Sequence, residues 1–124
     1  MRAPIQYALG YPDRFSGPVK GPDLAAQGPL EFFPVDRRQF PSLDLAYGAL
    51  RAGGTAPAVL NAANEIAVHA FLSRRLDFPG IPRVVERVLE RHRPVPVTGL
   101  ETVLEADGWS RAQAEEILSR GGAG

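Results

Sequence analysis

Pro-Ala-Val-Leu-Asn-Ala-Ala-Asn-Glu-Ile-Ala-Val-His-Ala-Phe-Leu, residues 57–72, is the stretch that decides the fold of this 124-residue chain. Its apolar residues recur at helical spacing, and Leu60, Ala67 and Phe71 fall within a narrow arc. The stretch therefore predicts an amphipathic helix, which we expect to begin here and to continue to about Arg75.

Two asparagines interrupt the apolar face of this helix. At 100° per residue, Asn64 falls between Phe71 and Val68, and Asn61 lies just beyond Val68. A buried primary amide is costly unless it is hydrogen-bonded. We predict that Asn61 and Asn64 are structural buried amides that bind the main chain of a neighbouring segment; direct contact with a ligand is the alternative.

Helical patterns continue on both sides of this stretch. Before it, Leu43 to Leu50 have helical spacing and Gly53-Gly54 predicts the helix stop. After it come an apolar stripe and two sequences that fit capping boxes, with Gly108 between them as the expected division of the tail into two helices. The stripe is Ile81, Val84, Val85, Val88 and Leu89; the boxes are Thr98-Gly-Leu-Glu101 and Ser110-Arg-Ala-Gln113; Trp109, Ala114, Ile117 and Leu118 are expected to face the core.

The segments between these helices are short, which favours antiparallel neighbours in a bundle. The fold class is therefore mainly α, with a C-terminal bundle of four to five helices over residues 37–124. Residues 1–36 form a Pro/Gly-rich, extended arm, in which Pro4 to Gly10 predict a short helix and Leu30 to Phe33 are compatible with a short strand. The arm has too little periodic apolar surface to fold alone. We expect it to be either mobile or exchanged between two chains in an arm-swapped homodimer.

Composition excludes several classes of protein. The chain has 14 basic and 14 acidic residues, so neither a nucleic-acid surface nor an anionic membrane surface is indicated. It has no long apolar run for a transmembrane helix. It has no cysteine, which excludes disulfides and thiolate chemistry and fits a cytoplasmic location.

No group of residues indicates catalysis. Glu65 and His69 have the spacing of a general acid–base pair, but a solvated helix-surface pair is the favoured interpretation. His92 is expected to interact with the terminal carbonyls of its helix. The two histidines have no clustered carboxylates, so no metal site is predicted. Arg37-Arg38 is interpreted as a solvated boundary and not as an anion site.

Several ordered segments resemble one enzyme family, 1-deoxy-D-xylulose 5-phosphate reductoisomerase, in its C-terminal part. Asn61-Ala-Ala-Asn64-Glu65, with Gly53-Gly54-Thr55-Ala56-Pro57 before it, is similar to a segment of that family, and Met1-Arg2-Ala3-Pro4-Ile5 is similar to its internal Met-Arg-Thr-Pro-Ile. The other similar segments, in order, are Tyr11–Arg14, Leu30–Pro34, Phe40–Leu43 and Ala46–Leu50. The resemblance covers most of residues 1–75 and, more loosely, residues 76–120.

The resemblance implies an NADPH-dependent conversion of 1-deoxy-D-xylulose 5-phosphate to 2-C-methyl-D-erythritol 4-phosphate, in non-mevalonate isoprenoid biosynthesis. It implies that NADPH, a divalent metal (Mg²⁺, Mn²⁺ or Co²⁺) and the substrate phosphate are bound by parts of the enzyme that precede the position of Met1. Only Met1 is then expected near the active site, as a wall of the substrate pocket. The chain is expected to be a fragment, inactive alone, in which residues 1–36 resemble the end of the catalytic domain and its linker and residues 37–124 are the C-terminal helical domain. Its partner is the rest of the enzyme, whose active site the helices buttress.

A hypothesis of a different class is a stand-alone helical interaction module without catalysis. It rests on the initial methionine and on the missing catalytic groups. An exposed apolar patch would favour it, whereas a dinucleotide fingerprint encoded in frame upstream of Met1 would favour the enzyme fragment.

Overall fold

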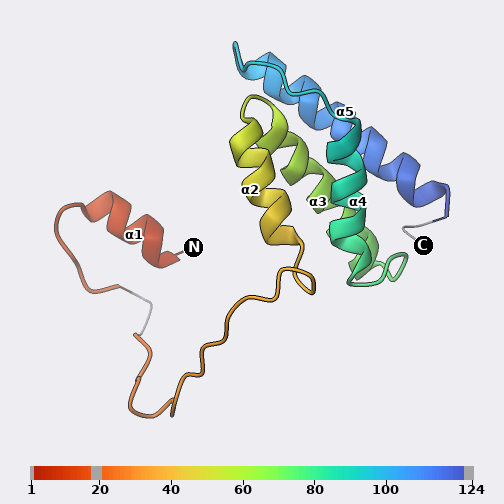
Figure 1. The fold of residues 1–124 in the computed structure, drawn as a ribbon. Helices are drawn as coiled ribbons and strands as arrows, with labels where there is room; N and C mark the ends of the chain where they lie inside the picture. Colours follow the sequence, from red (N-terminus) through yellow and green to blue (C-terminus); the bar gives the residue numbers. More distant parts are fainter. Residues whose placement is uncertain (1, 18–20, 122–124) are drawn as a thin grey trace. The chain divides into compact units, whose positions relative to one another are not determined.

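The computed structural model describes residues 2–17 and 21–121, and its regular structure is helical. The helices are α1 (Arg2–Gly10), α2 (Ser42–Ala52), α3 (Ala56–Leu72), α4 (Gly80–Arg91) and α5 (Leu100–Ser119). Helices α2 to α5 gather in one bundle (Figure 1), so the predicted mainly α class is confirmed. The described residues contain no strand. The strand considered at Leu30–Phe33 is therefore wrong, because no second extended segment pairs with it.

The chain divides into two units, Met1–Pro34 and Val35–Gly124. The first unit holds α1, which has no buried residue. Its contacts are local: Tyr7 and Tyr11 meet edge to face at 6.0 Å, the Arg14 guanidinium lies 4.4 Å from the Tyr7 ring centre, and Gln6 Nε2 donates to the Phe15 carbonyl at 2.8 Å. These contacts join α1 to the residues that follow it, but they bury no residue of α1 and so form no core.

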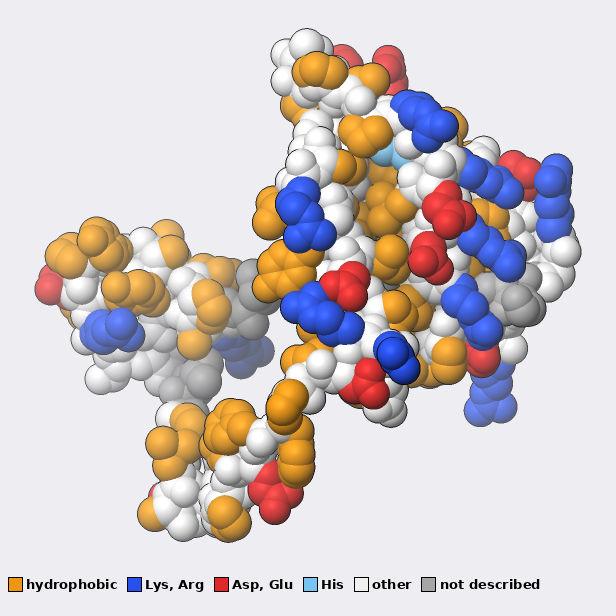
Figure 2. All heavy atoms as spheres, viewed as in Figure 1, with side chains coloured by type: hydrophobic (Ala, Val, Ile, Leu, Met, Phe, Trp, Pro, Cys, Tyr) orange, Lys and Arg blue, Asp and Glu red, His pale blue; other side chains and the backbone are white. Residues whose placement is uncertain are grey.

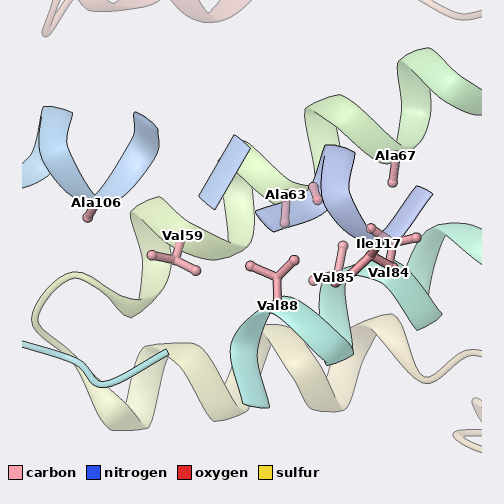
Figure 3. Packing of buried hydrophobic residues seen from close by; sticks show 9 residues of the cluster. Val59, Ala63, Ala67, Val84, Val85, Val88, Ala106 and Ile117 are labelled. Atoms are coloured by element: carbon pink, nitrogen blue, oxygen red, sulfur yellow. The ribbon is translucent and has the colours of Figure 1, made fainter. Parts of the chain in front are cut away.

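The core of the second unit is built from small side chains. On α3 the fully enclosed positions are mainly alanines, and α4 contributes valines. Figure 3 shows Val59 and Ala63 of α3 converging with Val88 of α4 and Ile117 of α5. Because alanine and valine extend little from the backbone, the helices approach closely and pack without long interdigitating side chains. The buried cluster is Val59, Ala63, Ala67, Val84, Val85, Val88, Ala106, Ala114 and Ile117.

Helix α5 is continuous through Gly108, so the predicted division of the tail into two helices is wrong. Its buried residues, Ala106, Ser110, Ala114 and Ile117, recur at helical spacing on both sides of the glycine. A glycine inside a helix costs roughly 1 kcal/mol relative to alanine. Packing of one unbroken face against α3 and α4 outweighs that cost.

Both predicted capping boxes are also wrong. Gly99, and not Thr98, is the N-cap of α5, and the Thr98 hydroxyl bonds Thr102 at 3.0 Å. Ser110 lies inside α5, where its fully buried hydroxyl donates to the Val59 carbonyl at 2.8 Å. A hydroxyl that would suit a helix start on sequence grounds instead joins α5 to the first turn of α3.

Helices α2 and α3 end in different ways. Gly53 ends α2 with φ +67°, as the glycine pair predicts, and its N–H donates to the Ala49 carbonyl. Helix α3 ends at Leu72, three residues before the predicted Arg75. Arg74 adopts φ +58° there, and the Arg75 N–H reaches back to the Ala70 carbonyl at 2.8 Å. This is a Schellman-type turn without glycine, and its sequence gives no warning of it.

Candidate functional site

An apolar groove of about 810 Å³ opens on the bundle where α2 and α4 begin, and α3 contributes to its lining. We call it the Phe-Pro groove, because two Phe-Pro pairs contribute to its lining. Its main apolar residues are Phe40, Pro41, Leu43, Phe78, Pro79 and Ile81. A hollow of this size lined mainly by apolar side chains is typical of a binding site.

The groove arises from the same local sequence used twice. Phe40-Pro41-Ser42-Leu43 opens α2, and Phe78-Pro79-Gly80-Ile81 opens α4. Pro41 and Pro79 are the N-caps, with φ of −66° and −65°. Because proline already has the φ of a helix, each segment enters its helix directly at the proline, and each Phe-Pro pair lies at a helix start.

The aromatic residues of the groove remain exposed. Phe40 is 51% exposed and Phe78 is 66% exposed, although Phe78 also meets Phe71 edge to face at 5.7 Å. Leu43 at the start of α2 is 39% exposed. Single exposed apolar residues are common on protein surfaces, but several gathered around one hollow are typical of a surface that binds another molecule.

Asn61 and Asn64, predicted to be buried amides, lie outside the core. Asn64 is half-buried and lines the Phe-Pro groove together with Val68. Asn61 is exposed, and its Nδ2 donates to Glu65 Oε1 at 3.2 Å on its own helix. Neither amide is therefore enclosed. The face of α3 that the bundle buries is the alanine face, and the arc of larger side chains that contains Asn64 lies beside it.

Charged side chains of both signs surround the groove. Arg83 binds Asp77 at 3.1 Å through both carboxylate oxygens, and Arg38 and Glu86 also line the hollow. Arg37 pairs with Asp44 on the exposed surface. Figure 2 shows basic and acidic side chains interspersed on the visible face of the bundle. The groove therefore has no single-sign field that would select an anion.

Neither Glu65 nor His69 lines the Phe-Pro groove. Glu65 instead binds Arg111 of α5 at 2.6 Å, and Arg111 binds Asp107 at 2.7 Å. The hydrogen bond from Arg111 lowers the pKa of Glu65, and another from the same guanidinium lowers the pKa of Asp107. His69 is exposed. This cluster is a surface clamp that joins α3 to α5.

The other predicted residues have varied outcomes. Met1 lies outside the described residues. His92 is the C-cap of α4, and its Nε2 lies 2.9 Å from the hydroxyl of Thr55, the N-cap of α3; its interaction with the terminal carbonyls of α4 stays a prediction. Within residues 2–17 and 21–121, no three His, Cys, Asp or Glu side chains come together as they would around a metal ion. In that same part of the chain, no helix is long and apolar enough to cross a bilayer.

Sequence reasoning missed the Phe-Pro groove. The signal was present in the repeated Phe-Pro-x-Leu/Ile sequence at Phe40 and Phe78. Each copy alone reads only as a helix start. That the two starts lie side by side depends on how α2 and α4 pack on α3, which helical periodicity does not specify.

Comparison with known proteins gives one consistent result. A family model described as the DXP reductoisomerase C-terminal domain matches residues 1–113. The chain is 50% identical over 121 residues to the 1-deoxy-D-xylulose 5-phosphate reductoisomerase of Citrifermentans bemidjiense, which covers 98% of this chain and 31% of that protein. The reductoisomerase of Moorella thermoacetica is 53% identical over 117 residues, covering 94% and 30%.

Solved structures agree. The reductoisomerase from Zymomonas mobilis in complex with NADPH superposes with a TM-score of 0.81 at 37% identity, covering 94% of this chain and 31% of that one. A second reductoisomerase, in complex with magnesium, superposes with a TM-score of 0.74 at 34% identity, covering 96% and 32%. The chain thus spans about a third of the length of the relatives that it matches.

Proposed function

Since the chain belongs to the 1-deoxy-D-xylulose 5-phosphate reductoisomerase family, as its C-terminal part, we propose that it serves the NADPH-dependent conversion of 1-deoxy-D-xylulose 5-phosphate to 2-C-methyl-D-erythritol 4-phosphate in the cytoplasm. The observation that carries this proposal is the identity of 50% spread over 98% of the chain. The chain contributes structure to this non-mevalonate isoprenoid step, and the chemistry belongs to the rest of the enzyme.

The proposed role is to buttress the catalytic part through the Phe-Pro groove. The groove leaves Phe40 and Phe78 more than half exposed, and covering such rings releases ordered water and gains free energy. The relatives carry roughly two-thirds of their length outside the region matched here, which provides a partner surface. Docking a rigid bundle on a catalytic domain restricts that domain's geometry, as a supporting element of an active site does.

NADPH and the divalent metal are assigned to the rest of the enzyme. The related structures are described with NADPH and with magnesium bound. The described residues of this chain do not fit a metal, because they bring no three potential ligand side chains together. We propose that the rest of the enzyme carries out the reaction, and we expect the isolated chain to be inactive.

The arm, residues 1–36, is proposed to need a covering surface of its own. Leu30, Phe32 and Phe33 are exposed to 66%, 86% and 78%. In the whole enzyme the arm would be the end of the catalytic domain and its linker, and the rest of that domain would cover these side chains. In the isolated chain, exchange of the arm between two copies is the proposed substitute, giving a homodimer.

The test reconstitutes the enzyme from two pieces. The purified chain is mixed with a Moorella thermoacetica reductoisomerase that lacks the region matching this chain, and NADPH oxidation in the presence of 1-deoxy-D-xylulose 5-phosphate and Mg²⁺ is followed. We expect neither piece to turn over substrate alone and the mixture to be active. Leu43→Asp should weaken association by roughly 10- to 100-fold, because a charge would enter the groove.

Leu104→Asp is the matched control, since Leu104 is also a helical leucine, is 59% exposed and lies on α5 away from the groove. Circular dichroism of both variants checks that the bundle remains folded. Turnover by the isolated chain would contradict the inactive-piece proposal. Equal weakening by both variants would contradict the groove. Failure to bind the truncated enzyme, with the chain folded, would favour the stand-alone interaction module.

A further inference from the structure

The segment that joins α4 to α5 is fastened to the start of α3 at one buried threonine. Thr55 is fully buried, and its N–H donates to the Val95 carbonyl at 3.1 Å. The Val95 N–H donates in return to the Thr55 hydroxyl at 3.2 Å. His92 Nε2 lies 2.9 Å from the same hydroxyl. One side-chain oxygen therefore joins two residues of the connecting segment.

The backbone around this contact is shaped for it. Gly54 has φ +53°, and a Cβ there would lie 2.3 Å from the Val95 carbonyl oxygen. Only glycine allows the connecting segment to lie this close. On its other side the His92 ring lies 5.2 Å, centre to centre, from the Trp109 ring of α5. His92, the C-cap of α4, thus touches both the N-cap of α3 and Trp109 of α5.

The hydrogen-bond pattern distinguishes the protonation states of His92. The Thr55 hydroxyl has one proton, and its oxygen already accepts the Val95 N–H. With His92 neutral and protonated on Nδ1, the Thr55 hydroxyl donates to Nε2 and accepts from the Val95 N–H, so the hydroxyl is satisfied both as donor and as acceptor. With His92 protonated, Nε2 becomes a donor, so two N–H groups point at the same oxygen. The hydroxyl proton of the fully buried Thr55 side chain then loses Nε2 as its acceptor.

We propose that Thr55, His92 and Val95 form a proton-operated latch on the α4–α5 connection. While His92 is neutral the latch holds Val95 against the start of α3. Protonation of His92 releases the segment from Arg93 to Thr98 and leaves the helices in place. The proposal is independent of the reductoisomerase assignment, since it concerns a movement within the bundle.

Charged side chains of both signs lie around His92, so they do not by themselves favour one protonation state. Arg91, Arg93 and Glu105 line the hollow on the Trp109 side, and Asp44, Glu86 and Glu90 line the hollow on the other side. The C-terminal end of α4 favours a cation, but burial opposes it and lowers the pKa of His92. The latch is therefore expected to open below the ordinary pKa of histidine, about 6.5.

The experiment uses the full chain and two readouts over roughly pH 8 to pH 5, the range in which histidine titrates. Trp109 is the only tryptophan, and a protonated imidazole beside an indole quenches its fluorescence. Amide hydrogen exchange of Val95 gives a protection factor, which corrects for the pH dependence of the intrinsic rate. We expect fluorescence and Val95 protection to fall together, with one midpoint below the ordinary value. The protection should fall tenfold for each unit by which the pKa of His92 differs between closed and open latch.

Three variants test whether His92 and Thr55 cause these transitions. His92→Gln should abolish both transitions. Thr55→Val, which keeps the shape and removes the hydroxyl, should make Val95 protection low and independent of pH. His69→Gln, at the only other histidine, should leave both curves unchanged. A Trp109 transition in wild-type protein without a change in Val95 protection would overturn the latch, as would a transition that persists in His92→Gln. The wild-type curves decide the matter even where a variant fails to fold.

Discussion

Helices α1 and α4 are similar in length but differ in how much of their surface is packed against other helices. Helix α1 has 9 residues and buries none, whereas α4 has 12 residues and buries Gly80, Val84, Val85 and Val88. Both follow helical sequence patterns. A helix this short is marginal in water unless another surface covers its apolar face. The difference between the two units is therefore a difference in packing partners and not in helical propensity.

The largest expected effect is on proteolysis. In a monomer with a mobile arm, brief digestion with chymotrypsin should cut after Phe32, which is 86% exposed, at least a hundredfold faster than at sites in α3 or α5, because cleavage inside the bundle requires its unfolding. In an arm-exchanged dimer the partner covers Phe32, and cleavage there should be slow. Mass spectrometry of the fragments measures the ratio. Light scattering on the undigested protein gives its molecular mass and so distinguishes a monomer from a dimer. A monomer whose arm resists cleavage as well as the bundle does would contradict both a mobile and an exchanged arm.

The second effect is on the core. Val88→Ala removes two methyl groups from a fully buried position of α4, so it should lower the free energy of unfolding by about 2–3 kcal/mol. Urea unfolding followed by circular dichroism measures the change. Leu9→Ala in α1 is the control: this side chain is 84% exposed, and the expected change is within about 0.5 kcal/mol. Equal losses from both would mean that α1 shares the core of the bundle.

The third effect concerns one hydrogen bond. Ser110→Ala leaves the Val59 carbonyl without its buried donor and should cost about 1–2 kcal/mol. Ser119→Ala removes a similar bond, to the Glu116 carbonyl, from an exposed position and should cost much less. Thermal melting of both variants compares them. If Ser110→Ala melts with the wild type, α5 is not joined to α3 through this hydroxyl.

The smallest effect lies on the surface and depends on pH. The Arg111 guanidinium lowers the pKa of both Glu65 and Asp107. A carboxylate with a lowered folded-state pKa stabilises the fold above its ordinary pKa, about 4, and this contribution disappears as pH falls through the folded-state value. Arg111→Gln should therefore reduce stability at neutral pH and make the loss in acid shallower. Salt should weaken the wild-type effect, since the pairs are exposed; an unchanged acid profile in Arg111→Gln would exclude the clamp.

Helix positions were predictable where local signals suffice. The apolar stripe from Ile81 to Leu89 matches α4, and Gly53-Gly54 marks the end of α2. Each signal depends only on periodicity or on the φ that glycine permits, and both act within one turn of chain. The family resemblance also came from sequence alone, because it rests on ordered local segments.

The candidate site was less predictable. The buried face of α3 consists mainly of alanines, whose low hydrophobicity gives them little weight in an apolar pattern. The pattern therefore predicts Asn64 in the core, whereas the structure has it in the lining of the Phe-Pro groove. His92 and Thr55 are 37 residues apart and carry no motif. Only packing brings such residues together, because nothing in either local sequence refers to the other.

The sequence by itself therefore determined which segments are helical, roughly where they begin, and to which family they belong, since these follow from short-range sterics and from recurring local patterns. The tertiary structure decided the continuity of α5 through Gly108, the role of Ser110 as a link to Val59, and the meeting of two Phe-Pro pairs in one groove. In each case the local preference is worth about 1 kcal/mol or less, and the burial of a whole helix face is worth several times more.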